Sequence, residues 1–274
     1  MKKIKFAIIT TLVFILFSSI PGFAQTENES EQAPDAEKLA KQLANPVAAL
    51  ISLPLQNNFE FGVGPFDGFR YNLNIQPVIP ISLSENWNMI SRTIIPVITQ
   101  SDVSGPGTNE TGLGDIAQSI FFSPKEVKNG LVWGVGPVLL FPTATNTVLG
   151  AKKWGVGPNV LVLKLDGQWT YGALTNHIWS YAGEGSNKIN ATFFQPFMTY
   201  ANKTGASYTI ASENTQSWNT NIFGGFVGAY YSKVTKFGKQ MIQLGGGPKV
   251  YYGNNPFNPD WGIRANIILL FPKK

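Results

Sequence analysis

Ionisable and amide side chains interrupt several apolar, strand-like segments of this sequence, and they are the first candidates for chemistry. In segment 69–83 residues alternate, so Arg70 and the amides after it share one face and large apolar residues the other. A charge on the lipid face of a membrane sheet costs about 2–4 kcal/mol at the bilayer midplane. We therefore expect these groups to face a lumen, as structural ion pairs or as substrate-lining groups. The candidate lumen-lining residues are Glu60, Arg70, Asn72, Asn74, Gln76, Arg92, Asp115, Lys249 and Arg264.

The single histidine, His177, follows Asn176 and stands two residues before Trp179. Enzymes of the outer membrane can use a serine–histidine pair oriented by a carboxylate or an amide. Neither a nucleophile elbow nor a local Ser-x-x-x-His pattern accompanies this histidine. We interpret it as a rim histidine beside aromatic residues, assign no catalytic residue and predict that the protein is not an enzyme. A lipid-modifying enzyme that uses His177 remains the alternative.

Metal and cofactor chemistry find little support in the sequence. One histidine and no cysteine exclude a disulfide and a thiolate site, and disfavour a transition-metal site. The unit aromatic-Gly-Val-Gly-Pro occurs at 61–65, 133–137 and 154–158. A phosphate-binding loop would need a following helix, and usually a lysine, whereas β-forming residues follow here. We predict no cofactor, and we assign these glycines to curvature of a sheet covered by aromatic side chains.

The first 24 residues have the pattern of a secretory signal peptide. Lysines precede the apolar run 6–20, and Gly22 and Ala24 provide small residues for a cut before Gln25. This run of 15 residues is short for a spanning helix, although a retained anchor helix is the alternative. Three leader lysines contribute to the net charge of +5, so this charge does not indicate nucleic-acid binding.

The composition narrows the choice of fold class. Charged residues make up 14% and aromatic residues 13%, against about 25% charged in ordinary soluble domains. The chain has no apolar stretch of 18 residues, which excludes a helical membrane protein. In lipid, every backbone polar group must be paired internally, so a closed β-barrel is the remaining spanning structure. We expect the protein in a bacterial outer membrane, with lipid and the barrel assembly machinery as partners.

We predict three regions along the chain. Residues 1–24 are the signal peptide. Residues 25–55 form a polar lead-in and a short helix at 34–45, and the apolar stretch at its end either docks into a pore as a plug or lies under the barrel. Residues 56–274 form the barrel.

Alternating or apolar segments separated by turn signals fill the barrel region, and their even number is typical of single-chain bacterial barrels. Short connections alternate with mostly longer ones, which matches periplasmic turns and external loops. Tryptophans near the segment ends suit interfacial girdles, whereas a soluble β-sandwich would place them in its core. We predict an all-β fold, a transmembrane antiparallel up-and-down barrel of about 12 strands. The strands are predicted at 56–64, 68–83, 86–99, 112–123, 130–142, 152–165, 168–181, 189–201, 206–213, 219–234, 239–252 and 260–271.

Prolines inside these segments do not fit a regular wall, because each removes a ladder donor. We expect kinks or bulges there, and we hypothesise that they bend strands and open a side portal. The prolines concerned are Pro77, Pro80, Pro96, Pro137, Pro158, Pro196 and Pro248.

Several long motifs resemble one known family. They are LANPVAALISLPLQNNFEFGVG (43–64), YNLNIQPVIPISLSENWNMISRTIIPV (71–97), TGLGDI (111–116), FFSP (121–124) and PDWGIRANIILLFPK (259–273). Together they are similar to the phenol-degradation meta-pathway outer-membrane proteins, sometimes labelled "neuromedin U". The resemblance implies an outer-membrane barrel that moves small hydrophobic or aromatic molecules. Our preferred function is such a channel, and a structural barrel without transport is a further alternative.

Overall fold

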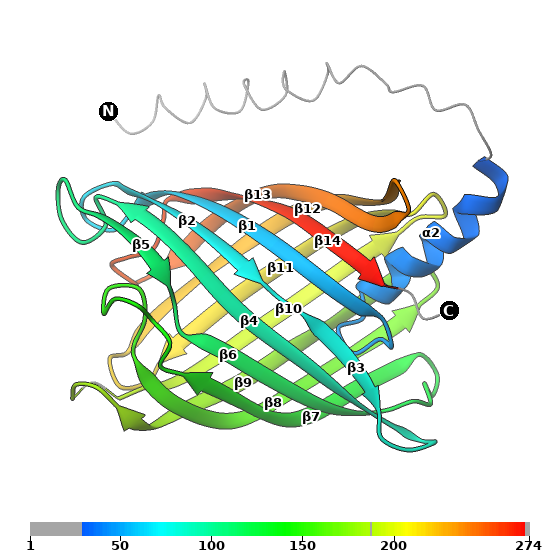
Figure 1. Cartoon of the computed structure of the whole chain (residues 1–274), viewed down its shortest axis with the longest axis horizontal. Coiled ribbons are helices and arrows are strands. Elements are labelled where there is room, and N and C mark those ends of the chain that lie inside the picture. The colour runs from blue at the N-terminus through cyan, green and yellow to red at the C-terminus, as the bar shows by residue number, and fades with distance from the viewer. Residues whose placement is uncertain (1–28, 187, 272–274) are drawn as a thin grey trace, which may run out of the picture. The chain divides into compact units, whose positions relative to one another are not determined.

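The computed structural model describes residues 29–186 and 188–271, and the predicted signal peptide lies outside them. The described residues from 33 to 271 belong to one compact unit, whose strands wrap into a closed wall (Figure 1). The elements are α2 (Glu29–Leu43), β1 (Ile51–Val63), β2 (Gly68–Ile75), β3 (Val78–Ser82), β4 (Trp87–Ser101), β5 (Asn109–Leu113), β6 (Ile116–Pro124), β7 (Leu131–Phe141), β8 (Lys153–Asp166), β9 (Trp169–Gly183), β10 (Asn190–Ala201), β11 (Ala206–Ser217), β12 (Ile222–Phe237), β13 (Gln240–Gly253) and β14 (Trp261–Phe271).

The fourteen strands occupy twelve positions around the wall. β2 and β3 are successive pieces of one position, because both pair with β1 and with β4. β5 and β6 are likewise successive partners of β4. All pairings are antiparallel between neighbours, and β14 pairs with β1 to close the sheet. The prediction of an up-and-down barrel of about 12 strands is confirmed.

β1 begins at Ile51, whereas the sequence prediction left residues 51–55 in the lead-in. They are strand because the register continues from Phe61 opposite Trp261 to Ile51 opposite Phe271. The lead-in helix also differs, because α2 begins at Glu29 and contains Pro34 instead of starting there. Within the described residues, no helix has the length and apolar character needed to cross a bilayer.

Outward-facing positions carry the apolar band that lipid requires. Along β14, Ile263, Ile267 and Phe271 are exposed, while the alternate residues Gly262 and Arg264 are buried. The closed wall and this apolar exterior place the barrel in the outer membrane. Exposed tryptophans lie at or near strand ends, as expected for interfacial girdles: Trp87, Trp154, Trp169, Trp179, Trp218 and Trp261.

The aromatic-Gly-Val-Gly-Pro units of β7 and β8 lie side by side in the wall, with Pro137 opposite Pro158. Neighbouring backbone approaches their glycines closely. A Cβ atom on Gly136 would lie 2.1 Å from the Ile120 carbonyl oxygen, and one on Gly157 would lie 1.6 Å from the His177 carbonyl oxygen. These glycines therefore permit close strand packing, and they do not form a loop before a helix.

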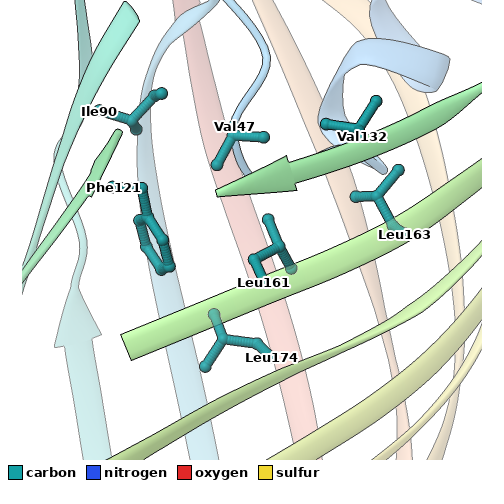
Figure 2. Packing of buried hydrophobic residues seen from close by; sticks show 7 residues of the cluster. All are labelled: Val47, Ile90, Phe121, Val132, Leu161, Leu163 and Leu174. Atoms are coloured by element: carbon teal, nitrogen blue, oxygen red, sulfur yellow. The ribbon is translucent and has the colours of Figure 1, made fainter. Parts of the chain in front are cut away.

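One end of the barrel contains the N-terminal segment. Leu39 and Ala40 of α2 pack with buried residues of the wall, including Ala201 and Leu270. Val47, in the connection between α2 and β1, is 5% exposed and lies among inward-facing wall residues (Figure 2). The other members of this cluster are Ile90, Phe121, Val132, Leu161, Leu163 and Leu174.

The wall is interrupted on both sides of β4. The first break lies at Gln76–Pro77 between β2 and β3, and the second at Gly114–Asp115 between β5 and β6. Pro96 of β4 lies opposite Asn74, close to both breaks. Six of the seven prolines singled out from the sequence lie within continuous strands: Pro80, Pro96, Pro137, Pro158, Pro196 and Pro248.

Residues 142–152, between β7 and β8, cover the second break. The two Asp115 carboxylate oxygens accept hydrogen bonds from the Ala144 and Lys152 backbone N–H groups, at 3.0 and 2.9 Å. The Thr143 hydroxyl donates to the Gly114 carbonyl oxygen at 2.9 Å and accepts from the Ile116 N–H at 2.8 Å. Asp115 thus holds a loop over an interruption in the wall.

Candidate functional site

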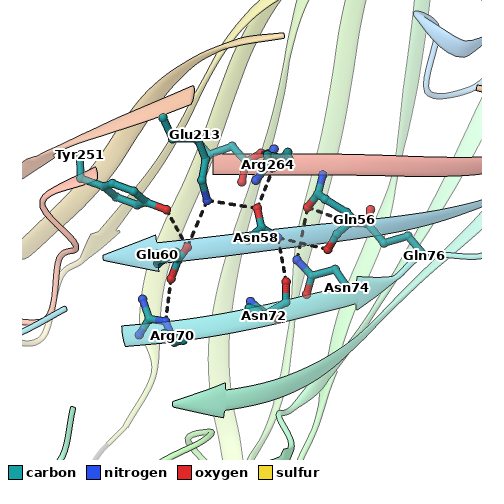
Figure 3. Close-up of polar contacts among 11 residues, drawn as sticks. Gln56, Asn58, Glu60, Arg70, Asn72, Asn74, Gln76, Glu213, Tyr251 and Arg264 are labelled. Carbon is teal, nitrogen blue, oxygen red and sulfur yellow. Dashed lines mark hydrogen bonds and ion pairs between the residues drawn. The ribbon is translucent and has the colours of Figure 1, made fainter. Parts of the chain in front are cut away.

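Inward-facing charges from strands that are not neighbours meet inside the barrel (Figure 3). Glu60 of β1 accepts hydrogen bonds from Arg70 Nε at 2.7 Å, Lys249 Nζ at 3.2 Å and Tyr251 Oη at 2.6 Å. Lys249 and Tyr251 belong to β13, and β14 separates that strand from β1. Because the contacts of Lys249 and Tyr251 with Glu60 cross over β14, they run through the lumen.

A second ion pair reaches farther across the lumen. Arg264 Nη1 of β14 donates to Glu213 Oε1 of β11 at 2.8 Å, and two strands separate them in the wall. Asn58 Oδ1 joins the two ion pairs, because it accepts from Arg264 Nε at 2.8 Å and from Lys249 Nζ at 3.1 Å. Both cations also lie over the Phe226 ring, at 4.8 and 5.1 Å from its centroid. We call this connected group the lumen belt: Asn58, Glu60, Arg70, Glu213, Lys249, Tyr251 and Arg264.

Amides along β1 and β2 form a ladder near the belt. Gln56 Oε1 accepts from Asn74 Nδ2 and Gln76 Nε2, each at 3.3 Å. Gln76 Oε1 in turn accepts from Arg92 Nη2 of β4 at 2.7 Å. Directly opposite Asn58, Asn72 receives a hydrogen bond on its backbone oxygen at 3.1 Å.

The nine residues predicted to line the lumen thus separate into two groups. Eight lie in the belt, in the amide ladder or in hydrogen-bond contact with one of these. Asp115 is different, because its carboxylate is occupied by the backbone of residues 144 and 152. A carboxylate that interrupts an apolar strand has the same sequence pattern in either role.

Sequence reasoning missed Asn58, Glu213 and Tyr251. The strand predicted at 206–213 ends at Glu213, before a loop. β11 in fact continues to Ser217, because both β10 and β12 pair with it along this stretch. Alternation extended through residues 214–217 would have placed Glu213 on a continuous strand.

Two cavities lie in contact with the belt. The helix-side cavity, of about 280 Å³, is lined by residues 42–46 together with Gln76, Arg92, Tyr230 and Arg264. The loop-side cavity, of about 270 Å³, is lined by Glu213 and Tyr251 together with residues 255 and 258 of the β13–β14 loop. Because Arg264 lines one cavity and its partner Glu213 the other, this ion pair lies between them.

His177 lies apart from this site. Its Nδ1 is 2.8 Å from Thr192 Oγ1, its ring packs against Trp179 at 4.1 Å between centroids, and its Nε2 is buried without a partner among the described residues. The structure pairs this ring with no serine hydroxyl or carboxylate in the part of the chain it describes. This geometry favours the rim interpretation. Over the same residues, no group of three potential metal ligands is found.

Comparisons with known proteins give a structural likeness only. No protein-family model matches the sequence, and no curated protein matches it. The COG4313 outer membrane channel from Pseudomonas putida F1 is similar in structure, with a TM-score of 0.66, 14% identity, and coverage of 81% of this chain and 96% of that chain.

Two other solved barrels are less similar. The NanC porin has a TM-score of 0.48 at 10% identity, and the beta domain of the Bordetella autotransporter BrkA has 0.46 at 12%. Each likeness covers 81% of this chain and 100% of the other, but these TM-scores are too low to define a shared fold. The likeness to the COG4313 structure therefore supports the fold of an outer-membrane β-barrel, and the comparisons give no sequence-level support for a phenol-degradation family.

Proposed function

We propose that this barrel is a passive channel for small molecules that are largely apolar or aromatic. The helix-side cavity carries the proposal, because it presents apolar side chains beside polar groups that would orient a small organic molecule. Its apolar lining residues include Leu43, Leu50, Val78, Leu174, Phe197 and Ile268. The likeness to an outer-membrane channel supports the same function.

The N-terminal segment is proposed to occlude the periplasmic end of this path. Short turns lie at the end of the barrel where α2 packs, since Gly205 of the β10–β11 turn is next to Ala36. Outer-membrane barrels place their short turns in the periplasm. Residues 42–50 supply part of the wall of the helix-side cavity, so a molecule that leaves toward the periplasm must displace them.

Removal of this segment tests the proposal. We expect a deletion of residues 36–48, which leaves β1 intact, to raise the rate at which cells take up the fluorescent aromatic amine 1-N-phenylnaphthylamine several-fold. Heat-modifiable gel migration would establish that the shortened chain still forms a barrel. An unchanged uptake rate with a folded barrel would contradict the occlusion.

A reversible cross-link provides a sharper test, since the chain contains no cysteine. A Cβ atom built on Gly134 would lie 3.4 Å from Val47 Cγ1, so cysteine side chains at these two positions would be in contact. We expect the double variant Val47→Cys/Gly134→Cys to lose uptake when oxidised and to recover it in dithiothreitol. The single variant Val47→Cys is the control and should not respond to the redox state.

A further inference from the structure

The lumen belt and the neighbouring Arg92 carry more cationic than acidic side chains. The lumen belt and Arg92 together contain four cationic side chains, but only Glu60 and Glu213 are acidic. Glu60 contacts Arg70 and Lys249, and Glu213 contacts Arg264. Arg92 has no carboxylate within 4.0 Å in the described part of the chain, and it donates only to the neutral Gln76 amide.

The uncompensated charge faces the helix-side cavity. Arg92 and Arg264 both line it, and none of its lining residues is an aspartate or a glutamate. Arg264 uses Nε and Nη1 in its hydrogen bonds, which leaves Nη2 available. The cavity therefore exposes guanidinium donors and no protein acid to accept from them.

Other donors at this cavity also lack a partner. The hydroxyls of Tyr230 and Ser207 are both buried and have no hydrogen-bond partner among the described residues. Both residues line the cavity. Buried polar groups in proteins are almost always paired, and an unpaired one is costly. An acceptor oxygen placed beside Tyr230 and the two guanidinium groups would give the Tyr230 hydroxyl the partner that it lacks.

We propose that the helix-side cavity binds the carboxylate of an amphipathic molecule. The carboxylate accepts from Arg92 and Arg264, for which the planar guanidinium fork is well suited, and from the Tyr230 hydroxyl. The apolar part of the molecule packs on the apolar wall formed by Leu174, Phe197 and their neighbours. The inference rests on the proposed channel function and narrows its substrates to organic anions with an apolar tail or ring.

Three ligands of equal chain length test the sign of the recognised charge: octanoate, octanol and octylammonium. Binding is measured by isothermal titration calorimetry of the mature protein, purified in a neutral maltoside detergent, for wild type and for Arg92→Gln. The heat of ligand partitioning into the micelles is the same in both titrations and therefore cancels in the comparison. We expect octanoate to bind wild type, and Arg92→Gln to weaken it on the order of tenfold or more, because a hydrogen bond to a charged group is lost. Octylammonium should not bind at the site.

The variant Lys236→Gln is the matched control, because it removes an equal charge from the exposed end of β12. It should bind octanoate as wild type does. If Arg92→Gln fails to form a barrel, Tyr230→Phe replaces it, and this variant should weaken octanoate several-fold. Equal affinity of wild type and Arg92→Gln for octanoate, or binding of octylammonium as tight as that of octanoate, would overturn the proposal.

The anion-site proposal and the channel proposal can be refuted independently of each other. Uptake of the neutral aromatic amine that depends on the N-terminal segment, together with absent octanoate binding, would keep the channel and refute the anion site. Octanoate binding without any solute uptake would keep the site and refute the channel.

Discussion

The two sides of the lumen are built in different ways. On β1, β2, β11, β13 and β14, inward-facing charged and amide groups are joined across the barrel by directional contacts at 2.6 to 3.2 Å. On β4 and β6 to β9, buried apolar side chains face inward and surround Val47. The polar side is thus held by specific side-chain partners, whereas Val47 is held against the apolar side by nonpolar burial.

This difference indicates which part of the lumen is rigid and which part is able to move. A buried charge that loses its partner strongly destabilises the folded protein. The side chains of the lumen belt are therefore expected to keep the arrangement in which every charge is paired. Apolar packing is non-directional, and a segment that rests on it separates at a cost in proportion to the buried area. We therefore expect the belt to act as a rigid filter and the N-terminal segment to act as the movable part.

The largest effect should follow from Glu60→Gln. This change leaves the buried Lys249 ammonium, whose side chain is 0% exposed, without its carboxylate. Removal of one partner of a buried ion pair costs about 3–5 kcal/mol. The urea midpoint of barrel unfolding in lipid vesicles, followed by heat-modifiable gel migration, should fall accordingly.

The matched control for this change is Glu126→Gln. Glu126 pairs with Lys128 at 3.6 Å, but both side chains are about three-quarters exposed, at 74% and 77%. Exposed pairs of this kind contribute little because water screens them. A midpoint that moved as far in Glu126→Gln as in Glu60→Gln would remove the distinction between the belt and the surface.

A smaller effect should follow from Val47→Ala on the apolar side. The loss of two buried methyl groups costs about 1–3 kcal/mol, and the cost should appear as release of the N-terminal segment. Limited proteolysis should cut within residues 36–50 faster in this variant. The urea midpoint of the barrel itself should remain where it is in wild type, and a matching fall there would show that the segment and the wall unfold as one.

The sequence predicted the wall better than the site, for physical reasons that particular residues illustrate. Alternation along residues 261–271 places Arg264 inward whichever strands lie nearby, because the side-chain period in a strand is two. Alternation does not reveal which side chains are partners. Arg264 pairs with Glu213, 51 positions away in the chain, because the closed barrel brings β14 and β11 to face each other. Asp115 shows the converse, because its charge interrupts an apolar strand and yet serves a loop.

The start of β1 could not be predicted from local pattern either. Residues 51–55 are mostly apolar, which suits a plug, a strand or a segment under the barrel equally well. Their assignment depends on β14, whose residues 267–271 pair with them more than 200 positions later in the sequence. The N-terminal segment is similar, since Val47 is buried only because the closed wall provides a cavity around it.

The smallest effect should follow from His177→Ala, which tests whether a polar group outside the belt matters. His177 loses one contact to Thr192, at 2.8 Å, and its packing on Trp179. A hydrogen bond between neutral groups contributes about 0.5–1.5 kcal/mol, so the urea midpoint should fall only slightly. Uptake of the aromatic amine should match wild type. Any phospholipid hydrolysis by the wild-type protein should also persist in this variant; a hydrolytic activity abolished by His177→Ala would instead assign the barrel a catalytic role on its rim.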